Sequence, residues 1–342
     1  MSTRNLRSIE PESRTPCRRT QRNLRAVAIF FLLTFLPPAL CFSANPSGKT
    51  KKVTPAPLAP GAYFGLKLPE KTPELLAPGI ISIPGRSVGN VVFSADATEC
   101  YFTVFDGPWN NPRILFTRYE NGAWTPPALA TFADGRQENA MLFSRDGNRL
   151  YFGVSTSPSV TDLWMVQRAS RGEEWSKPQP LPAPLNSLLS SFKAQVFLQT
   201  ADGTMYFVSN RDVGHGDIYR TVSKPGQPLQ VENLGAPVSS ELEKVDLGIS
   251  PDGHTLVFFS KPNRPSVTNN ATDLFICFDN GHGGWTTPVN MGEEFNTLTD
   301  IEYAPTFSQD GRVLFFSRFD GKYGEVYWVS TSALERFRKL SQ

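Results

Sequence analysis

Apolar and polar residues follow one arrangement that recurs five times along the chain. Each copy has a short apolar strand, a polar turn with an acidic residue, and a second apolar strand. The copies are VVFSADATECYFT (91–103), MLFSRDGNRLYFG (141–153), VFLQTADGTMYFV (196–208), LGISPDGHTLVFFS (247–260) and PTFSQDGRVLFFS (305–317). Self-similarity at a spacing of 50 to 58 residues indicates a repeat architecture.

Each copy has the residue chemistry of a β-hairpin. Asp-Gly accepts the positive φ angles of a tight turn, and apolar strands flank it. The first copy has Ala97 in place of glycine, so we expect its turn to be the least regular. The second strands carry adjacent large apolar residues, which point to opposite faces of a strand. Both faces must then be buried, as in a sheet packed between two neighbouring sheets.

Further strands follow each hairpin. A third strand is expected in every copy, as RILFTRY (113–119), DLWMVQR (162–168), DIYRTVS (217–223), DLFICFD (273–279) and EVYWVST (325–331). A weaker fourth segment has the form Trp-x-x-Pro and begins at Trp124, Trp175 and Trp285. Four strands in about fifty residues, repeated radially, are typical of the blades of a β-propeller.

The pattern predicts an all-β chain with a single β-propeller of five four-stranded blades over residues 62–342. The fifth copy lacks a fourth strand, and a spare strand-like segment at residues 75–82 precedes the first copy. We expect this N-terminal strand to complete the fifth blade, because it closes the ring and removes an open edge. Six blades are the alternative, if residues 62–90 form more than one strand.

A short C-terminal helix is expected after the last blade. Ser332 and Glu335 have the spacing of a capping box, and Leu334, Phe337 and Leu340 recur at helical spacing. A frayed tail is the alternative.

The repeated sequence motif FSxDGxxLYF, followed by DLYxV, resembles the WD40-like (PD40) propeller repeats of TolB-type periplasmic proteins of bacteria. The resemblance covers residues 62–331. It implies a β-propeller in the cell envelope, and docking on an envelope partner as TolB-type propellers do. It does not imply a particular reaction, since these propellers serve many roles.

Residues 1–44 have the order of a secretory signal peptide. Seven arginines precede an apolar run at residues 26–36, two prolines, and small residues up to Ala44. The apolar run is short for a membrane-spanning helix, which needs about 20 residues. We expect cleavage after Ser43 or Ala44 and a periplasmic or secreted protein. The alternatives are an uncleaved membrane anchor and a lipid on Cys41.

The formal net charge of +2 is unevenly distributed. It resolves into +5 for residues 1–25, +3 for residues 45–61 and −6 for residues 62–342. The Pro-, Gly- and Lys-rich segment 45–61 predicts a flexible linker. A propeller with a net negative charge is not expected to bind nucleic acid.

Candidate functional groups are sought where the repeat is broken on the top face. This face carries the links from the second to the third strand and from the fourth strand to the next blade. Glu138 and Glu302 each lie six residues before the serine of their hairpin, and Glu243 falls close to the same level. Carboxylates around one pocket near the channel mouth are able to do acid–base work or hold a cation. Solvated or structurally bonded acids are the alternative.

Four further candidates lie in the top links. Arg211 and Arg318 have the planar guanidinium that grips a carboxylate or a sugar acid. His215 inserts an imidazole into a glycine-rich link, and Trp109 has a ring able to stack on a sugar. Loop packing or a solvated surface is the alternative for all four.

Established catalytic motifs are missing from the sequence. It has no Gly-x-Ser-x-Gly elbow, phosphate loop or dinucleotide fingerprint. The three histidines are far apart, so neither a metal site nor a cofactor is expected. Cys100 and Cys277 fall in non-adjacent blades, so we expect two buried thiols and no disulfide.

Three functions are compatible with these features. The first is an exported, non-enzymatic propeller that binds a glycan or an envelope protein on its top face. The second is a carbohydrate-active enzyme, a hydrolase or lyase, that uses top-face carboxylates. The third is assembly on an envelope partner. The absence of a recognisable catalytic set favours a binding module over an enzyme, and the oligomeric state is not indicated.

Overall fold

The computed structural model describes residues 58–107, 109–157, 160–183, 185–186, 197–212, 215–239, 244–260 and 272–341. All of them belong to one compact unit of the chain, Phe42–Gln342. The expected signal peptide, most of the expected linker, and Glu243 lie outside the described residues. No helix in the described ranges is long and apolar enough to cross a membrane.

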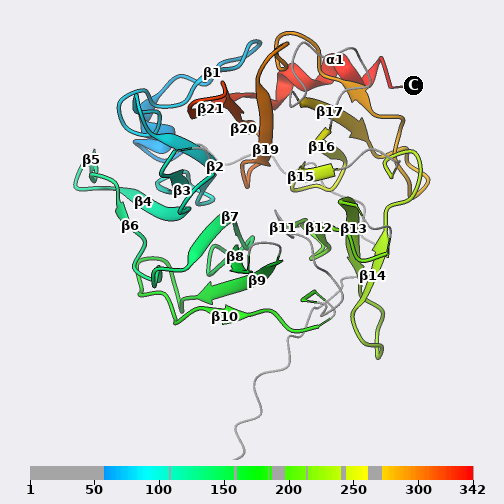
Figure 1. The fold of residues 1–342 in the computed structure, drawn as a ribbon, viewed down its shortest axis with the longest axis horizontal. Helices are drawn as coiled ribbons and strands as arrows, with labels where there is room; N and C mark the ends of the chain where they lie inside the picture. Colours follow the sequence, from blue (N-terminus) through cyan, green and yellow to red (C-terminus); the bar gives the residue numbers. More distant parts are fainter. Residues whose placement is uncertain are drawn as a thin grey trace, which may run out of the picture. The chain divides into compact units, whose positions relative to one another are not determined.

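Five antiparallel sheets are arranged around a common axis (Figure 1), and each is one predicted blade. Blade 1 has β2 (Ser87–Phe93), β3 (Glu99–Phe105) and β4 (Arg113–Glu120), and β4 pairs with both β5 (Ala123–Trp124) and β6 (Ala128–Leu129). Blade 2 has β7 (Gln137–Phe143), β8 (Arg149–Ser157), β9 (Val160–Gln167) and β10 (Gln179–Pro180). Blade 3 has β11 (Phe197–Gln199), β12 (Met205–Ser209), β13 (Asp217–Val222) and β14 (Gln230–Asn233).

The last two blades complete the ring. Blade 4 has β15 (Lys244–Ile249), β16 (Thr255–Ser260), β17 (Asp273–Phe278) and β18 (Val289–Asn290). Blade 5 has β19 (Ile301–Phe307), β20 (Val313–Phe319) and β21 (Gly324–Ser330), and its outer strand is β1 (Glu74–Leu75) from the start of the described chain. Glu74 pairs with Trp328 and Leu75 with Tyr327, so the predicted closure by an N-terminal strand is confirmed, and with it the count of five blades. The closing strand covers only Glu74–Leu75, whereas it was expected within residues 75–82.

The hairpin turns are held by the repeated serine and aspartate. Ser144 Oγ donates to Asp146 Oδ1 at 2.6 Å, and Ser308 Oγ donates to Asp310 Oδ1 at the same distance. Gly147 and Gly311 take positive φ angles in these turns, and Ala97 adopts a φ of 56° at the same place in blade 1. A residue with a Cβ is strained at this angle. The first turn nevertheless keeps the regular hydrogen bonds, since Ser94 Oγ donates to Asp96 Oδ1 at 2.7 Å and the Ala97 N–H donates to the Ser94 carbonyl at 2.8 Å.

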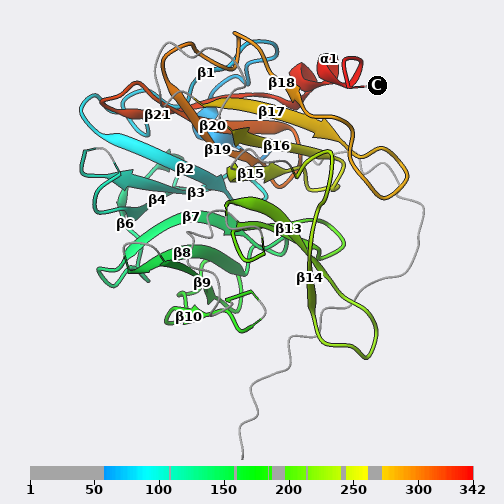
Figure 2. The ribbon, with the colours of Figure 1, turned by 45° about the vertical axis from the view of Figure 1, so that its right-hand side comes forward.

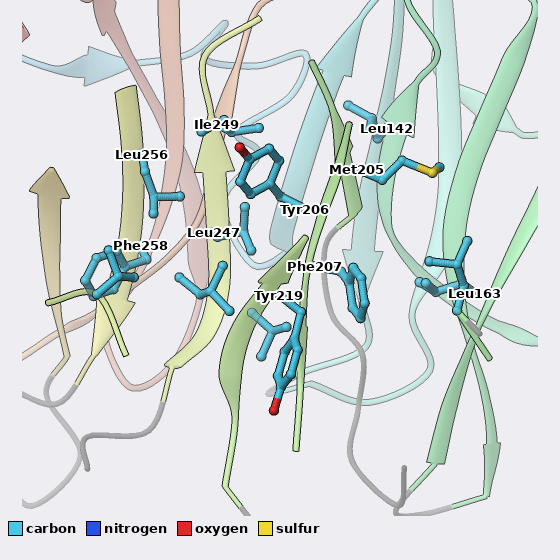
Figure 3. Packing of buried hydrophobic residues seen from close by; sticks show 14 of the residues in the cluster. Leu142, Leu163, Met205, Tyr206, Phe207, Tyr219, Leu247, Ile249, Leu256 and Phe258 are labelled. Carbon is cyan, nitrogen blue, oxygen red and sulfur yellow. The ribbon is translucent and has the colours of Figure 1, made fainter. Parts of the chain in front are cut away.

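The core consists of aromatic and aliphatic side chains packed between adjacent blades. Figure 3 shows this for blades 2 to 4, where Tyr206 and Phe207 of β12 point to opposite sides of their strand. The Trp-x-x-Pro tryptophans pack between blades: Trp175 of blade 2 donates from Nε1 to the Tyr101 hydroxyl of blade 1 at 2.9 Å. Burial of both sheet faces therefore follows the doubled aromatic residues of the sequence.

The chain reaches blade 1 across the bottom face, the end that carries the Asp-Gly turns. A short 3-10 helix, η1 (Ala62–Gly65), places Tyr63 against the first turn, where its N–H donates to the Ala97 carbonyl at 3.1 Å. Trp124 Nε1 donates to the Gly61 carbonyl at 2.8 Å. Residues 61–65 are thus fixed to the bottom of the propeller.

The C-terminus forms a 3-10 turn, η2 (Thr331–Leu334), followed by the short helix α1 (Glu335–Arg338) beside β17 (Figure 2). The predicted helix is present, but the predicted capping box at Ser332 is not: Ser330 ends β21 in extended geometry and caps η2, where its side chain accepts from the Ser332 N–H. The helix α1 itself has no side-chain cap. Phe337 packs on Phe295 with ring centroids 5.8 Å apart. Cys100 and Cys277 are buried free thiols, as expected.

Candidate functional site

Trp109 lies on the top face, in the link between β3 and β4 of blade 1. Its side chain is 44% exposed, and it is the one exposed aromatic side chain in the described part of the chain. The indole contacts Phe105 of its own blade and Tyr303 and Phe319 of blade 5, with ring centroids 5.6, 4.7 and 5.1 Å apart. One side of Trp109 is therefore seated on the seam between blades 5 and 1, while nearly half of it remains open to solvent.

The link that carries Trp109 has a defined backbone. Trp109 and Asn111 adopt left-handed φ angles of 60° and 46°, and such residues persist only where their surroundings hold them. The Asp106 N–H donates to the Asn110 carbonyl at 2.9 Å. The Arg113 guanidinium binds Asp106 through two hydrogen bonds, of 3.1 and 2.5 Å, at the base of the link. These contacts fix the position of the indole.

The seam beneath Trp109 is held by hydrogen bonds between blades. The Tyr303 hydroxyl donates to the Val88 carbonyl at 3.0 Å, and the Ser317 hydroxyl donates to the Gly89 carbonyl at 2.8 Å. A Cβ at Gly89 would lie 2.8 Å from the Phe105 ring, so the glycine allows that ring to pack under the indole. Blade 1 and blade 5 thus form one rigid support.

Glu302 and Arg318 are brought together by the pairing of β19 with β20. Arg318 Nε lies 3.1 Å from Glu302 Oε1, which also accepts the Thr297 N–H at 3.0 Å. The Glu302 carboxyl is fully buried, and its Oε2 has no hydrogen-bond partner among the described residues. Burial raises the pKa of Glu302 to about 7, against the lowering effects of the Thr297 N–H and of Arg318.

Arg211 and Arg318 occupy equivalent places in blades 3 and 5. Arg318 lies over Tyr327, 4.5 Å from the ring centroid, and Arg211 lies over Phe207 at 5.1 Å. Each guanidinium donates to a backbone carbonyl of the link that leads into its own blade, at Phe295 O (3.1 Å) and Leu185 O (3.3 Å). Both arginines therefore support the links of the top face, and a ligand would have to share them with these partners.

The other sequence-predicted residues are dispersed. Glu138 is buried on β7 of blade 2, where burial raises its pKa to about 7. Glu302 lies in blade 5, on the other side of blade 1, and neither carboxyl is among the groups that shift the pKa of the other. His215 lies in the link between β12 and β13 and takes part in interactions there. Glu243 lies outside the described residues.

Two polar residues on the innermost strands were not predicted from the sequence. The register shifts at a β-bulge in four of these strands, between Val88 and Val91, Asn139 and Leu142, Lys244 and Leu247, and Tyr303 and Thr306. Asn90 lies in the first of these bulges and Asp246 in the third. A polar residue four positions before the serine of an otherwise apolar strand is the signal that would have indicated them.

Asn90 and Asp246 join neighbouring blades. Asn90 accepts the Met141 N–H of blade 2 at 2.8 Å and donates to the Thr306 hydroxyl of blade 5 at 3.0 Å. Asp246 Oδ2 accepts the Ala304 N–H at 3.2 Å, while its Oδ1 has no hydrogen-bond partner among the described residues. Burial raises the pKa of Asp246 to about 7. In the described ranges no cluster of three or more His, Cys, Asp or Glu side chains is arranged to hold a metal ion.

These observations define a five-bladed β-propeller with an exposed aromatic residue on a rigid seam of its top face. The fold resembles TolB from Acinetobacter baumannii (18% identity, TM-score 0.42, 71% of this chain and 54% of that chain). It also resembles a TolB homologue described as putative from Agrobacterium tumefaciens (16% identity, TM-score 0.43, 69% and 73%). A third similar structure is described as an RGII complex of BT0996 (11% identity, TM-score 0.48, 78% and 92%).

At these identities the likeness concerns the fold alone. The chain spans about half the length of the A. baumannii protein. No protein-family model matches the sequence. No curated protein matches it either.

Proposed function

We propose that the protein is an exported binding module that recognises a glycan on the top face of its propeller, with Trp109 as the stacking residue. The observation that carries the proposal is the half-exposed indole held over Tyr303 and Phe319. An aromatic ring with one open face presents a flat apolar surface at little entropic cost, because its position is already fixed. The C–H face of a pyranose ring matches such a surface.

The enzyme alternative receives less support from the geometry. Glu302 and Glu138 have pKa values raised to about 7, which suits a general acid. Both carboxyls are buried, however, and they belong to blades that are not adjacent. A general acid must reach the proton that it transfers, so we do not assign them to catalysis.

Glycan-array binding by residues 62–342, followed by calorimetry on the oligosaccharides that bind, tests the proposal. Trp109→Ala is expected to weaken binding at least 10-fold, because a stacked ring at the centre of a site carries much of its affinity. Leu129→Ala is the matched control, since Leu129 is an exposed apolar residue on β6 at the outer edge of blade 1. Equal affinities of Trp109→Ala and the parent protein would refute the site.

Export is a separate part of the proposal. It is supported by the basic, apolar and small-residue order of residues 1–44. Expression of the full chain in a bacterium, with fractionation and N-terminal sequencing, is expected to place the protein in the periplasm or medium. Its N-terminus should then be Ala44 or Asn45. A cytoplasmic protein with an intact N-terminus would contradict this.

A further inference from the structure

Residues with planar polar groups flank Trp109 in its link. Asp106, Asn110, Asn111 and Arg113 are all exposed, and all belong to the same eight-residue stretch. Carboxylate, amide and guanidinium groups each present two polar atoms side by side, which matches two neighbouring hydroxyls. A sugar ring that stacks on Trp109 would turn its hydroxyl edge toward these groups.

The charge in this stretch is already balanced. Both terminal nitrogens of Arg113 are bound to the two carboxylate oxygens of Asp106, at 3.1 and 2.5 Å. Asp106 occupies two of the five N–H groups of the guanidinium, and a carboxylate or sulfate that bound the others would lie next to the Asp106 carboxylate. Like charges at that separation repel, so the stretch offers no net attraction to an anion.

The net charge of the propeller points the same way. Residues 62–342 carry a net charge of −6, which disfavours the approach of a polyanion. Neither the balanced charge of Arg113 nor the net negative charge of residues 62–342 disfavours an uncharged, hydroxyl-rich ligand.

We infer that the Trp109 site takes neutral hexose glycans and discriminates against acidic ones, with the Asp106–Arg113 pair as its specificity determinant. This inference rests on the proposed glycan-binding function. It assigns to Asp106 the role of cancelling the Arg113 charge, which would otherwise attract the carboxylate of a uronic acid.

Calorimetry with glucose oligomers and with glucuronic-acid oligomers of the same length and linkage, and with the corresponding galactose and mannose pairs, tests the inference. The neutral member of the bound pair is expected to bind at least 10-fold more tightly at low ionic strength. Its affinity should change less than 2-fold between 20 mM and 500 mM salt, because no charge is exchanged on binding.

The Asp106→Asn variant is expected to increase the affinity for acidic oligomers. It leaves the Arg113 charge uncancelled, so the uronic-acid oligomers are expected to gain at least 5-fold in affinity. The matched control is Asp134→Asn, because Asp134 forms an exposed pair with Arg136 at 3.0 Å in a different link of the same face. This control should change neither affinity.

The possible failures are distinguishable. If the acidic oligomer binds as tightly as the neutral one, and Trp109→Ala abolishes both, the specificity inference is wrong and the proposed function stands. The inference is also wrong if Asp106→Asn gains no affinity for the acidic oligomers. If neither oligomer binds in a Trp109-dependent way, the proposed function fails together with the inference.

Discussion

Asp246 carries a carboxyl group that the fold buries without a full set of partners. Asp246 is 4% exposed. One of its carboxylate oxygens accepts the Ala304 N–H, and the other has no hydrogen-bond partner among the described residues. The described groups in electrostatic contact with it are the Ala304 amide and the Tyr303 hydroxyl. Desolvation therefore dominates and raises its pKa from 3.8 to about 7.

The raised pKa makes stability depend on pH in a defined direction. Above pH 4 the unfolded chain loses this proton while the folded protein keeps it, so stability falls as pH rises until the folded group also ionises near pH 7. A displacement of about 3 pKa units corresponds to about 4 kcal/mol. More than half of this loss falls between pH 5 and pH 8.

Asp246→Asn isolates this effect. Asparagine has the shape of the protonated carboxyl and keeps the acceptor for the Ala304 N–H, so the variant and the parent should be about equally stable at pH 4. At pH 8 the variant should be more stable by about 4 kcal/mol, because it has no charge to bury.

Urea unfolding of both proteins from pH 4 to pH 8 measures the difference. Glu120→Gln is the control, since Glu120 pairs with Arg118 in an exposed place on β4, and its difference from the parent should stay within about 0.5 kcal/mol at every pH. If the difference between Asp246→Asn and the parent is constant over this range, the buried carboxyl does not have a raised pKa.

Three further changes test contacts between blades. Arg168→Ala removes an ion pair with Glu99 that joins blades 2 and 1 through hydrogen bonds of 3.0 and 2.7 Å. The free energy of unfolding in urea should fall by about 3 kcal/mol. Starting from a Glu99→Ala background, the same change should cost less than half as much. Gly248→Ala would place a Cβ 2.7 Å from the Pro305 carbonyl oxygen, so the unfolding free energy should fall by about 2 kcal/mol or more, and no change would contradict the close approach of blades 4 and 5. Trp175→Phe loses one hydrogen bond to a buried tyrosine and should lower stability by about 1 kcal/mol in the same assay.

The repeat made the architecture predictable, because local chemistry decides a hairpin. Asp-Gly turns and doubled aromatic residues indicate a two-sided sheet, and five copies indicate the blade number. The pairing of Glu74–Leu75 with β21 followed from the missing strand in the fifth copy. The cap of η2 at Ser330 did not follow, since it depends on where β21 ends in space rather than on residue spacing.

The site was less predictable because it depends on contacts between distant residues. Trp109 could be singled out in its link, but its support by Tyr303 and Phe319 arises only when the ring closes. Glu302 was visible as a carboxylate, whereas its pairing with Arg318 depends on the β19–β20 register. Asp246 was missed because a single acid in an apolar strand has no motif around it.

The attachment of residues 61–65 to the bottom turns determines how the propeller would be presented to its surroundings. The described chain enters beside Ala97 and Trp124, at the end opposite to the Trp109 link. Contacts that other molecules make with residues 58–65 would therefore leave the proposed Trp109 site open.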